Sequence, residues 1–251
     1  MKQRIVYLIV IISAAVAMAS SLTACSVGDT NYAPVTDISS FEKVPKQGIY
    51  RVQPGETLYS IAWRYGMDYR YLARRNGIAP PYHIVPSQII YLRGKASAVK
   101  TYPAPQMVSN SKASMSVERE PTARVSYWIW PTRGDVIGRY SASNKGINIG
   151  GRLGQPIHAA AAGKVVYSGN GLRGYGNLII IKHNSVYLTA YAYNDSVLVK
   201  EGDWVTASQV IAGMGAAGSG RVMLHFEIRV SGKPVDPLRY LDLSSRRPAT
   251  A

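Results

Sequence analysis

The sequence RVMLHFEIR, residues 221–229, places His225 among alternating apolar residues, a pattern typical of a β-strand. A histidine in this setting can be a zinc ligand or a hydrogen-bonded residue of the core. Zinc hydrolysis requires three protein ligands, an open position for water and a neighbouring acid or base. Because the chain has only 4 His and 1 Cys, the nature of this position depends on whether other residues can complete a ligand set.

The segments that would position such a site follow one another along 251 residues. A compact stretch covers residues 48–92, and a Gly-rich stretch with many β-branched residues covers residues 127–243. Between them, residues 93–126 are rich in Ala, Ser, Pro and Lys, a composition that predicts a flexible linker because it buries too little apolar surface. Residues 25–47 are predicted to form a tether, and residues 244–251 a frayed tail.

The N-terminus predicts export and lipidation. A basic start, MKQR, precedes the apolar run of residues 5–22, which leads into LTAC at residues 22–25. LTAC resembles a bacterial lipobox, which implies removal of residues 1–24 and acylation of Cys25, with anchoring in a membrane. The apolar run could also form an uncleaved anchor helix, but the small residues before the only cysteine favour cleavage. Ser26 in place of Asp implies transfer to the outer membrane, facing the periplasm.

The formal net charge of +15 indicates an acidic partner, which can be nucleic acid, anionic lipid or an anionic wall polymer. No motif for binding DNA or RNA accompanies the charge, and the basic residues are dispersed. Export places the protein where cell wall is plentiful and nucleic acid scarce. We therefore expect peptidoglycan and membrane as partners, and no nucleic acid.

Residues 48–92 predict the element order β-α-α-β. The first helix is predicted to begin at Thr57, as N-cap, and to end at Gly66; the second is predicted to begin at Asp68 and to end at Gly77. One face of the first helix carries apolar residues at helical spacing: Leu58, Ile61, Ala62 and Tyr65. The run QIIYL predicts a returning strand.

The motifs YRVQPGETLYSIAWRYG, LARRNGI and SQIIYL resemble a LysM domain over nearly all of residues 48–92. The resemblance implies a small α+β module that binds N-acetylglucosamine-containing polymers such as peptidoglycan, in a groove between two loops. Carried over by motif position, the binding residues would be Gly55, Glu56, Thr57, Leu58, Asn76, Gly77 and Ile78. The motif brings no second carboxylate near Glu56, which argues against a glycosidase.

Residues 127–243 contain the runs KVVYSG, NLIIIKH, VYLTAYA and VMLHFEIRV, separated by Gly, Asn or Ser turns, and predict an all-β domain. Together with GINIGGRLGQPIHAAAAGKVVYSG and GKPVDPLRYL, these runs resemble the LytM (lysostaphin-type) peptidoglycan endopeptidases. The resemblance implies zinc ligands in a His-x-x-x-Asp motif and in a His-x-His motif, with a further catalytic histidine in Tyr-x-His.

This chain carries Asn144 and Asn148 at the two ends of the His-x-x-x-Asp motif. It carries Met223 and His225 at the His-x-His motif, and Tyr193 at the histidine of Tyr-x-His. Carboxamides and a thioether are poor zinc donors beside imidazole and carboxylate. A single histidine binds zinc too weakly for hydrolysis, so the resemblance implies a degenerate, non-catalytic groove without a cofactor, in which these residues could contact a partner.

The other histidines do not restore a ligand set. His83 lies in a loop of the LysM-like segment, and His158 lies where the LytM family commonly has no ligand. His183 ends a predicted strand before a turn, a position more typical of a structural residue. We therefore expect His225 to be a hydrogen-bonded remnant.

A lipoprotein with a LysM domain followed by a ligand-free LytM domain resembles the NlpD- and EnvC-type activators of Gram-negative bacteria. That resemblance implies activation of N-acetylmuramoyl-L-alanine amidases, splitting of septal peptidoglycan, separation of daughter cells and enrichment at the division septum. Two alternatives remain open: an active zinc endopeptidase with unconventional ligands, and a structural tether between outer membrane and wall. The sequence predicts an amidase activator that is not itself an enzyme.

Overall fold

The computed structural model describes residues 41–94 and 125–241, which belong to one compact unit. The predicted signal peptide, Cys25, most of the tether, residues 95–124 of the linker and residues 242–251 lie outside the described residues. Within the described residues, no helix has the length and apolar composition needed to cross a membrane.

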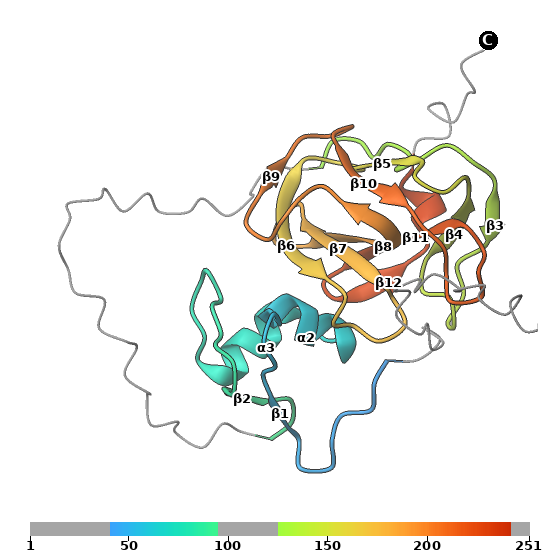
Figure 1. The fold of residues 1–251 in the computed structure, drawn as a ribbon. Coiled ribbons are helices and arrows are strands. Elements are labelled where there is room, and N and C mark those ends of the chain that lie inside the picture. The colour runs from blue at the N-terminus through green and yellow to red at the C-terminus, as the bar shows by residue number, and fades with distance from the viewer. Residues whose placement is uncertain (1–40, 95–124, 242–251) are drawn as a thin grey trace, which may run out of the picture. The chain divides into compact units, whose positions relative to one another are not determined.

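The first module has the predicted β-α-α-β order (Figure 1). Strand β1, Ile49–Arg51, pairs antiparallel with β2, Ile89–Tyr91. Helices α2, Leu58–Arg64, and α3, Tyr69–Asn76, lie between them in sequence and pack against each other. The prediction of a LysM-type α+β module is confirmed.

Short-range hydrogen bonds set the helix ends. Thr57 forms a capping box with Ser60: its Oγ1 accepts from the Ser60 amide at 3.1 Å, while Ser60 Oγ accepts from the Thr57 amide at 3.0 Å. The carboxylate of Asp68 accepts from the amides of Arg70 and Tyr71. Gly77 ends α3 with a φ of 63°, a left-handed conformation that glycine adopts without strain. The predicted caps are confirmed.

The last residues of the predicted tether pack on this module. The amide of Glu42 donates to the carbonyl of Arg64 at 3.1 Å, and Glu42 Oε1 lies 3.5 Å from Arg64 Nε. Phe41 lies against Gly66 at the end of α2. The tether therefore has a local structure at its C-terminal end that its irregular sequence did not indicate.

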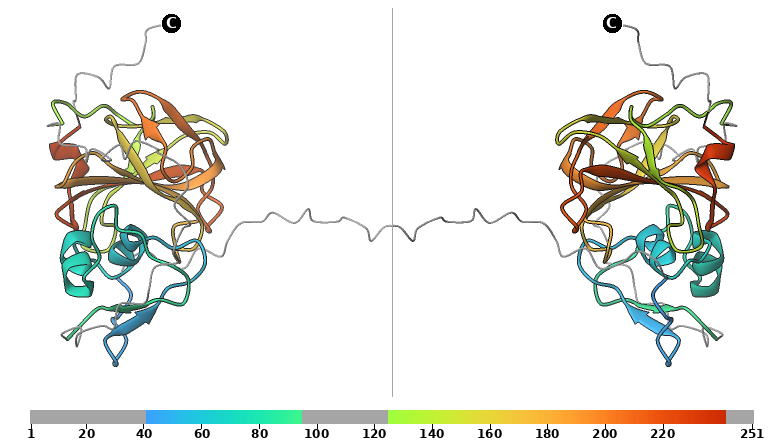
Figure 2. Two further views of the ribbon diagram at one scale, coloured as in Figure 1. Left: turned by 90° about the vertical axis from the view of Figure 1, so that its left-hand side faces the viewer. Right: turned by 90° about the vertical axis from the view of Figure 1, so that its right-hand side faces the viewer.

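The second module is a sheet of ten strands (Figure 1). Along the sheet the order is β3-β4-β11-β8-β7-β6-β9, with β12 on β11, and with β10 joining β8 to β5. The pairings are antiparallel, and the two views in Figure 2 show the twist of the sheet. The strands are β3 Val136–Gly138, β4 Ile147–Gly150, β5 Pro156–His158, β6 Gly163–Gly169, β7 Asn177–Lys182, β8 Tyr187–Val197, β9 Trp204–Val205, β10 Val210–Met214, β11 Met223–Val230 and β12 Lys233–Val235.

One 3-10 turn, Pro237–Arg239, is the only helical segment within residues 125–241. The prediction of an all-β LytM-type domain is therefore confirmed.

Strand β11 has two buried faces. Leu224, Phe226 and Ile228 point into one apolar cluster, which we call the core face. The alternate residues, His225, Glu227 and Arg229, are also fully buried but belong to the opposite face.

We call this opposite side the groove face. Residues directly opposite one another in paired strands share a face, and His225 pairs with Ala192 of β8 and Asn148 of β4. The groove face continues into an apolar cluster that includes Leu178 and Ile180 of β7, and the same cluster includes the LysM helices.

Candidate functional site

Two of the positions predicted from the sequence meet on the groove face. Asn148 of β4 lies opposite His225 of β11 in the strand register. The Oδ1 atom of Asn148 lies 2.7 Å from Nδ1 of His225, within hydrogen-bonding distance. The imidazole is fully buried. The structure thus brings an amide and an imidazole together where the LytM resemblance implies zinc ligands.

The second nitrogen of His225 is also engaged, because Nε2 lies 3.2 Å from Oε1 of Glu227. Glu227 Oε1 also accepts a hydrogen bond of 2.8 Å from the hydroxyl of Tyr175, and Glu227 Oε2 lies 3.0 Å from Nε of Arg229. These four side chains form one buried polar network, in which the Glu227 carboxylate is the common acceptor.

Two pKa shifts fix the protonation states in this network. Burial by itself would raise the pKa of Glu227, but the charge of Arg229 and the hydrogen bonds from His225 and Tyr175 lower it to about 2. Burial, and next the charge of Glu227, raise the pKa of Tyr175. Glu227 is therefore ionised at neutral pH, and Tyr175 keeps the proton that it donates.

The donor set does not fit the zinc ion that the LytM resemblance implies. A zinc ion needs imidazole, thiolate or carboxylate donors in a tetrahedral arrangement, whereas Nδ1 of His225 faces an amide oxygen. Across residues 41–94 and 125–241, no three His, Cys, Asp or Glu side chains lie close enough together to hold a metal. His225 and its neighbours therefore do not form a zinc-binding set.

The other predicted groove positions differ in what they contact. The ring centre of Tyr193 lies 6.0 Å from that of His225, and Tyr193 has a φ of 64°. Met223 begins β11, opposite Gly150, and is partly exposed. Asn144 donates from Nδ2 to backbone carbonyls of its own loop, at 2.9 and 3.0 Å. Asn144 is therefore committed to the loop, while Met223 remains accessible at the strand end.

His183 has the contacts of a structural residue. Its Nδ1 lies 2.8 Å from the carbonyl oxygen of Ala162, and its Nε2 lies 2.7 Å from Oγ1 of Thr189. Burial lowers the pKa of His183 to about 4, so the ring is neutral at pH 7. His158 is held by the backbone of Pro131, with Nδ1 3.3 Å from the carbonyl oxygen.

The glycan loop predicted before α2 is held by an ion pair. Glu56 Oε1 lies 2.6 Å from Nη2 of Arg64 and accepts from the hydroxyl of Tyr50 at 2.8 Å. Leu58 is fully buried, so in this conformation it offers no surface to a glycan. Gly55 is exposed, with a left-handed φ of 77° and open space beside it.

The second loop predicted to bind glycan, which follows α3, also has part of its hydrogen-bonding capacity used within the module. The side chain of Asn76 donates to the carbonyls of Leu72 and Tyr91 and accepts from the Tyr91 amide at 2.7 Å. It therefore ties α3 to β2. Gly77 is exposed, and Ile78 is partly buried against the apolar cluster.

Sequence analysis did not identify Glu227, Arg229 and Tyr175 as parts of the site, nor Trp63, whose carbonyl accepts a hydrogen bond of 3.0 Å from Nη1 of Arg229. The signal for the first two was present, because polar residues at every second position after His225 share its face of the strand. Tyr175 follows a glycine-rich turn, and Trp63 lies in a different module. Nothing in the local sequence links those two residues to β11.

The fold and this site define a class of protein: a LysM module followed by a β-domain of the M23 type. The LysM domain family matches residues 50–93, and Peptidase family M23 matches residues 142–237. Similar proteins include the lipoprotein NlpD/LppB homolog of Pseudomonas aeruginosa, which is 46% identical over 230 residues, covering 77% of each chain.

Two relatives from Escherichia coli K12 extend this result. The uncharacterized lipoprotein YgeR is 45% identical over 209 residues, covering 80% of this chain and 83% of that protein. The murein hydrolase activator NlpD is 41% identical over 255 residues, covering 76% of this chain and 67% of that protein. The chain belongs to the NlpD/LppB family of LysM–M23 lipoproteins.

Proposed function

We propose that this protein is a peptidoglycan-binding envelope lipoprotein that activates N-acetylmuramoyl-L-alanine amidases without cleaving peptidoglycan itself. The LysM domain supports binding to peptidoglycan, and the relatives named murein hydrolase activator support the activating role. The observation that carries the non-catalytic part is the hydrogen bond between Asn148 and His225 on the groove face.

The chemistry of this pair argues against hydrolysis. A metal-bound water is the nucleophile of zinc peptidases, and its activation needs a cation held by several anionic or imidazole donors. Here the carboxylate in contact with His225 is Glu227, whose charge is already balanced by Arg229. The groove face therefore offers shape and hydrogen-bonding groups rather than a reactive centre.

The rim of the groove is the contact surface that we propose for the amidase. Met223 is partly exposed at the start of β11, and Asn148 is partly exposed on β4. A thioether adapts its shape to an apolar partner, and an amide can donate and accept hydrogen bonds. A partner segment docked there would hold the amidase in its active conformation by differential binding.

The test is release of dye from labelled peptidoglycan by a purified amidase of this class, with and without the lipid-free chain. We expect stimulation by the chain and no release by the chain alone. Met223→Asp should weaken the stimulation about ten-fold, whereas Leu198→Asp, at an exposed position on the loop after β8, should not. About one zinc per chain, together with cleavage of muropeptides, would overturn the proposal.

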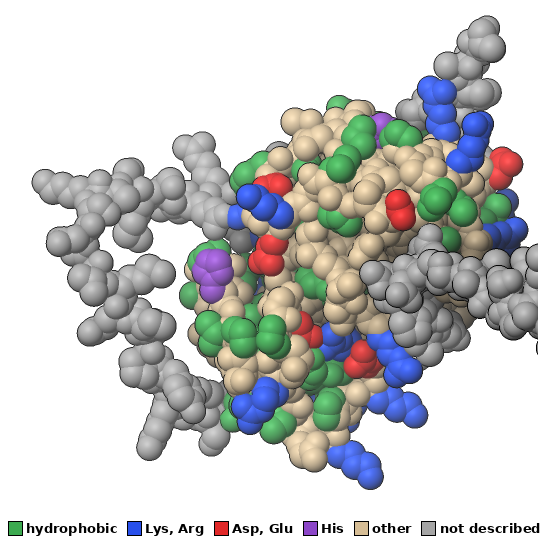
Figure 3. All heavy atoms as spheres, in the orientation of Figure 1, with side chains coloured by type: hydrophobic (Ala, Val, Ile, Leu, Met, Phe, Trp, Pro, Cys, Tyr) green, Lys and Arg blue, Asp and Glu red, His purple; other side chains and the backbone are tan. Residues whose placement is uncertain are grey.

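We further propose that acylated Cys25 anchors the protein in the outer membrane. The name of a relative from Histophilus somni, outer membrane antigenic lipoprotein B, supports this location. Lys and Arg side chains lie in several separate places on the face shown in Figure 3, which suits a diffuse attraction to anionic wall and lipid. Cys25→Ala should move the protein from the membrane to the soluble fraction.

Enrichment of a fluorescent fusion at the septum tests the proposed role in cell separation.

A further inference from the structure

The groove face of the LytM-type sheet is in direct contact with the LysM module. The Cζ atom of Arg229 lies 3.4 Å from the centre of the Trp63 ring, and Nη1 of Arg229 donates to the carbonyl of Trp63 at 3.0 Å. Both side chains are buried. Through Glu227 and Arg229, helix α2 is thus linked to the imidazole of His225.

A second contact joins the modules at Lys182, at the end of β7. Its ammonium nitrogen lies 5.9, 5.3 and 5.8 Å from the ring centres of Tyr59, Tyr69 and Tyr82. The three rings also contact one another, so they form an aromatic enclosure around the ammonium group. Such an arrangement stabilises a desolvated cation, which explains how Lys182 can be almost fully buried.

A third contact involves the loop proposed to bind glycan. Oγ1 of Thr57 donates to the carbonyl of Val166 on β6 at 3.1 Å, and Thr57 is only 8% exposed. The hydroxyl that a sugar would meet is therefore used by the sheet. Binding of a glycan at Thr57 and contact with β6 exclude each other.

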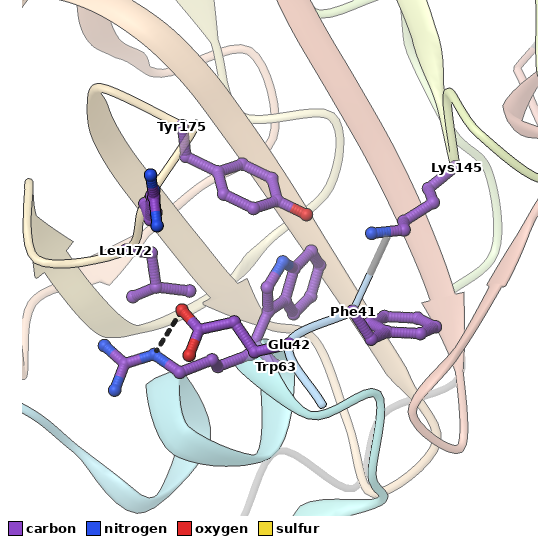
Figure 4. Close-up of a pocket in the computed structure, with 8 residues that line it drawn as sticks. Phe41, Glu42, Trp63, Lys145, Leu172 and Tyr175 are labelled. Atoms are coloured by element: carbon purple, nitrogen blue, oxygen red, sulfur yellow. Dashed lines mark ion pairs between the residues drawn. The ribbon is translucent and has the colours of Figure 1, made fainter. Parts of the chain in front are cut away.

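Little space is left between the modules and the end of the tether. The cavity there is about 30 Å³ and is lined by Phe41, Trp63, Lys145 and Tyr175, among others. Figure 4 shows the Tyr175 hydroxyl pointing toward the Trp63 ring, and the Lys145 amine pointing toward Phe41. A volume of this size holds a water molecule or two, but no peptide segment of a partner.

We infer that the LysM module holds the groove face closed, and that a glycan strand of peptidoglycan opens it. This inference rests on the proposed function, since it concerns access of the amidase to the groove. In the closed state the module covers Glu227 and Arg229, so an amidase segment that docks at the rim, at Met223 and Asn148, cannot extend along the groove face. A strand that binds the Thr57 loop competes with β6 and shifts the population toward the open state. Amidase binding is thereby restricted to molecules engaged with the wall.

Gly232, in the turn between β11 and β12, provides a variant that separates the modules. A Cβ atom at this position would lie 2.6 Å from the carbonyl oxygen of Met67 and 2.7 Å from the amide nitrogen of Asp68. These are backbone atoms of the LysM module and cannot move aside cheaply. Gly232 has a φ of 81°, which Asn tolerates better than other residues do, so Gly232→Asn should act as a wedge.

Gly202 provides the matched control. It has a φ of 93°, similar to that of Gly232, but a Cβ atom there would have no neighbour within 4 Å. Gly202→Asn carries the same backbone cost without touching the LysM module. Lys182→Gln is a second opening variant, which acts at the other contact by removing the charge from the tyrosine enclosure.

The first experiment measures binding of the lipid-free chain to an immobilised amidase, with and without peptide-free GlcNAc–MurNAc strands. We expect the strands to tighten binding by the wild-type chain at least five-fold. Gly232→Asn and Lys182→Gln should bind tightly without strands, and Gly202→Asn should behave as wild type. Detectable amidase binding that is equal for wild type and both opening variants, and unaffected by strands, would refute the closed state.

The second experiment measures binding of the same strands to each chain without amidase. Because a binding-competent state that is rarely populated lowers the apparent affinity, both opening variants should bind strands several-fold more tightly than wild type. Unchanged affinity would refute the competition at Thr57. If the variants bind strands more tightly but no chain binds the amidase, the closed state stands and the proposed function fails.

Discussion

The two faces of β11 are equally buried but are covered in different ways. The core face, with Leu224, Phe226 and Ile228, is covered by apolar side chains of its own domain. The groove face, with Glu227 and Arg229, is covered by the LysM module. Burial on the first face is a condition of folding, whereas burial on the second depends on contact with a separate module. An equally low exposed fraction therefore reflects packing within the domain on the core face, and contact with another module on the groove face.

The largest expected effect is on the core face. Phe226 is fully buried, and its ring centre lies 5.3 Å from that of Tyr191. Phe226→Ala should lower the free energy of unfolding by about 4 kcal/mol, since it removes the ring and leaves a cavity. Denaturant unfolding measures this loss. A cost below about 2 kcal/mol would show that the core face is loosely packed around Phe226.

The next effect is on the groove face. Arg229→Met should cost about 3 kcal/mol, because it leaves the Glu227 carboxylate buried without its main counter-charge. The loss is smaller than for an isolated charge, since His225 and Tyr175 still contact the carboxylate. Removal of the guanidinium also breaks the contact with Trp63, so amidase binding in the absence of glycan should increase.

The double variant Glu227→Gln with Arg229→Met provides the control for this charge effect. It removes both members of the ion pair, so most of the stability lost in Arg229→Met should return. Amidase binding should stay high, because Trp63 still lacks its partner. If the double variant were no more stable than the single one, lost packing against Trp63, rather than the unpaired charge, would account for the cost.

These two faces also show what the sequence could predict. The helix caps at Thr57, Asp68 and Gly77 were predictable because capping depends on residues within three or four positions. The all-β domain was predictable because period-2 alternation in runs such as VMLHFEIRV is a local property.

The environment of His225 was not predictable in the same way. Its contacts come from β4, β8 and the turn before β7, and Arg229 finds Trp63 at a separation of 166 residues. Alternation shows that His225, Glu227 and Arg229 share a face, but no local rule says that another module covers that face. The dual use of Thr57, as helix cap and as donor to β6, likewise appears only in three dimensions.

A smaller effect is expected from acid, at a site buried entirely within the sheet domain. His183 has a pKa of about 4 in the folded chain and a reference value of 6.5. Between these values the unfolded chain binds a proton that the folded chain does not, so stability falls as the pH falls. From pH 7 to pH 5 we expect a loss of about 2 kcal/mol from this residue.

Denaturant unfolding of the wild type and of His183→Gln at both pH values measures that loss. The variant should be less stable at pH 7 but should lose about 2 kcal/mol less than wild type on going to pH 5. Glu227 does not affect this comparison, because its stabilising effect is lost as the pH falls from the reference value of 4.5 to its folded pKa of about 2, below the pH range used here. Parallel losses in both proteins would contradict the assignment of a neutral, buried His183.

The smallest expected effect is on the LysM module, which covers the groove face, and not on the sheet itself. Asp68→Ala removes the acceptor for the amides of Arg70 and Tyr71 and should cost about 1 kcal/mol of α3 stability. Hydrogen exchange should become faster across α3, while the amides of β11 that pair with β4 and β8 keep their protection, since those bonds lie within the sheet. Asp68→Asn keeps the capping oxygen and should change exchange little. Faster exchange in β11 as well would mean that the sheet itself depends on the LysM module, and the distinction between the two faces would then be lost.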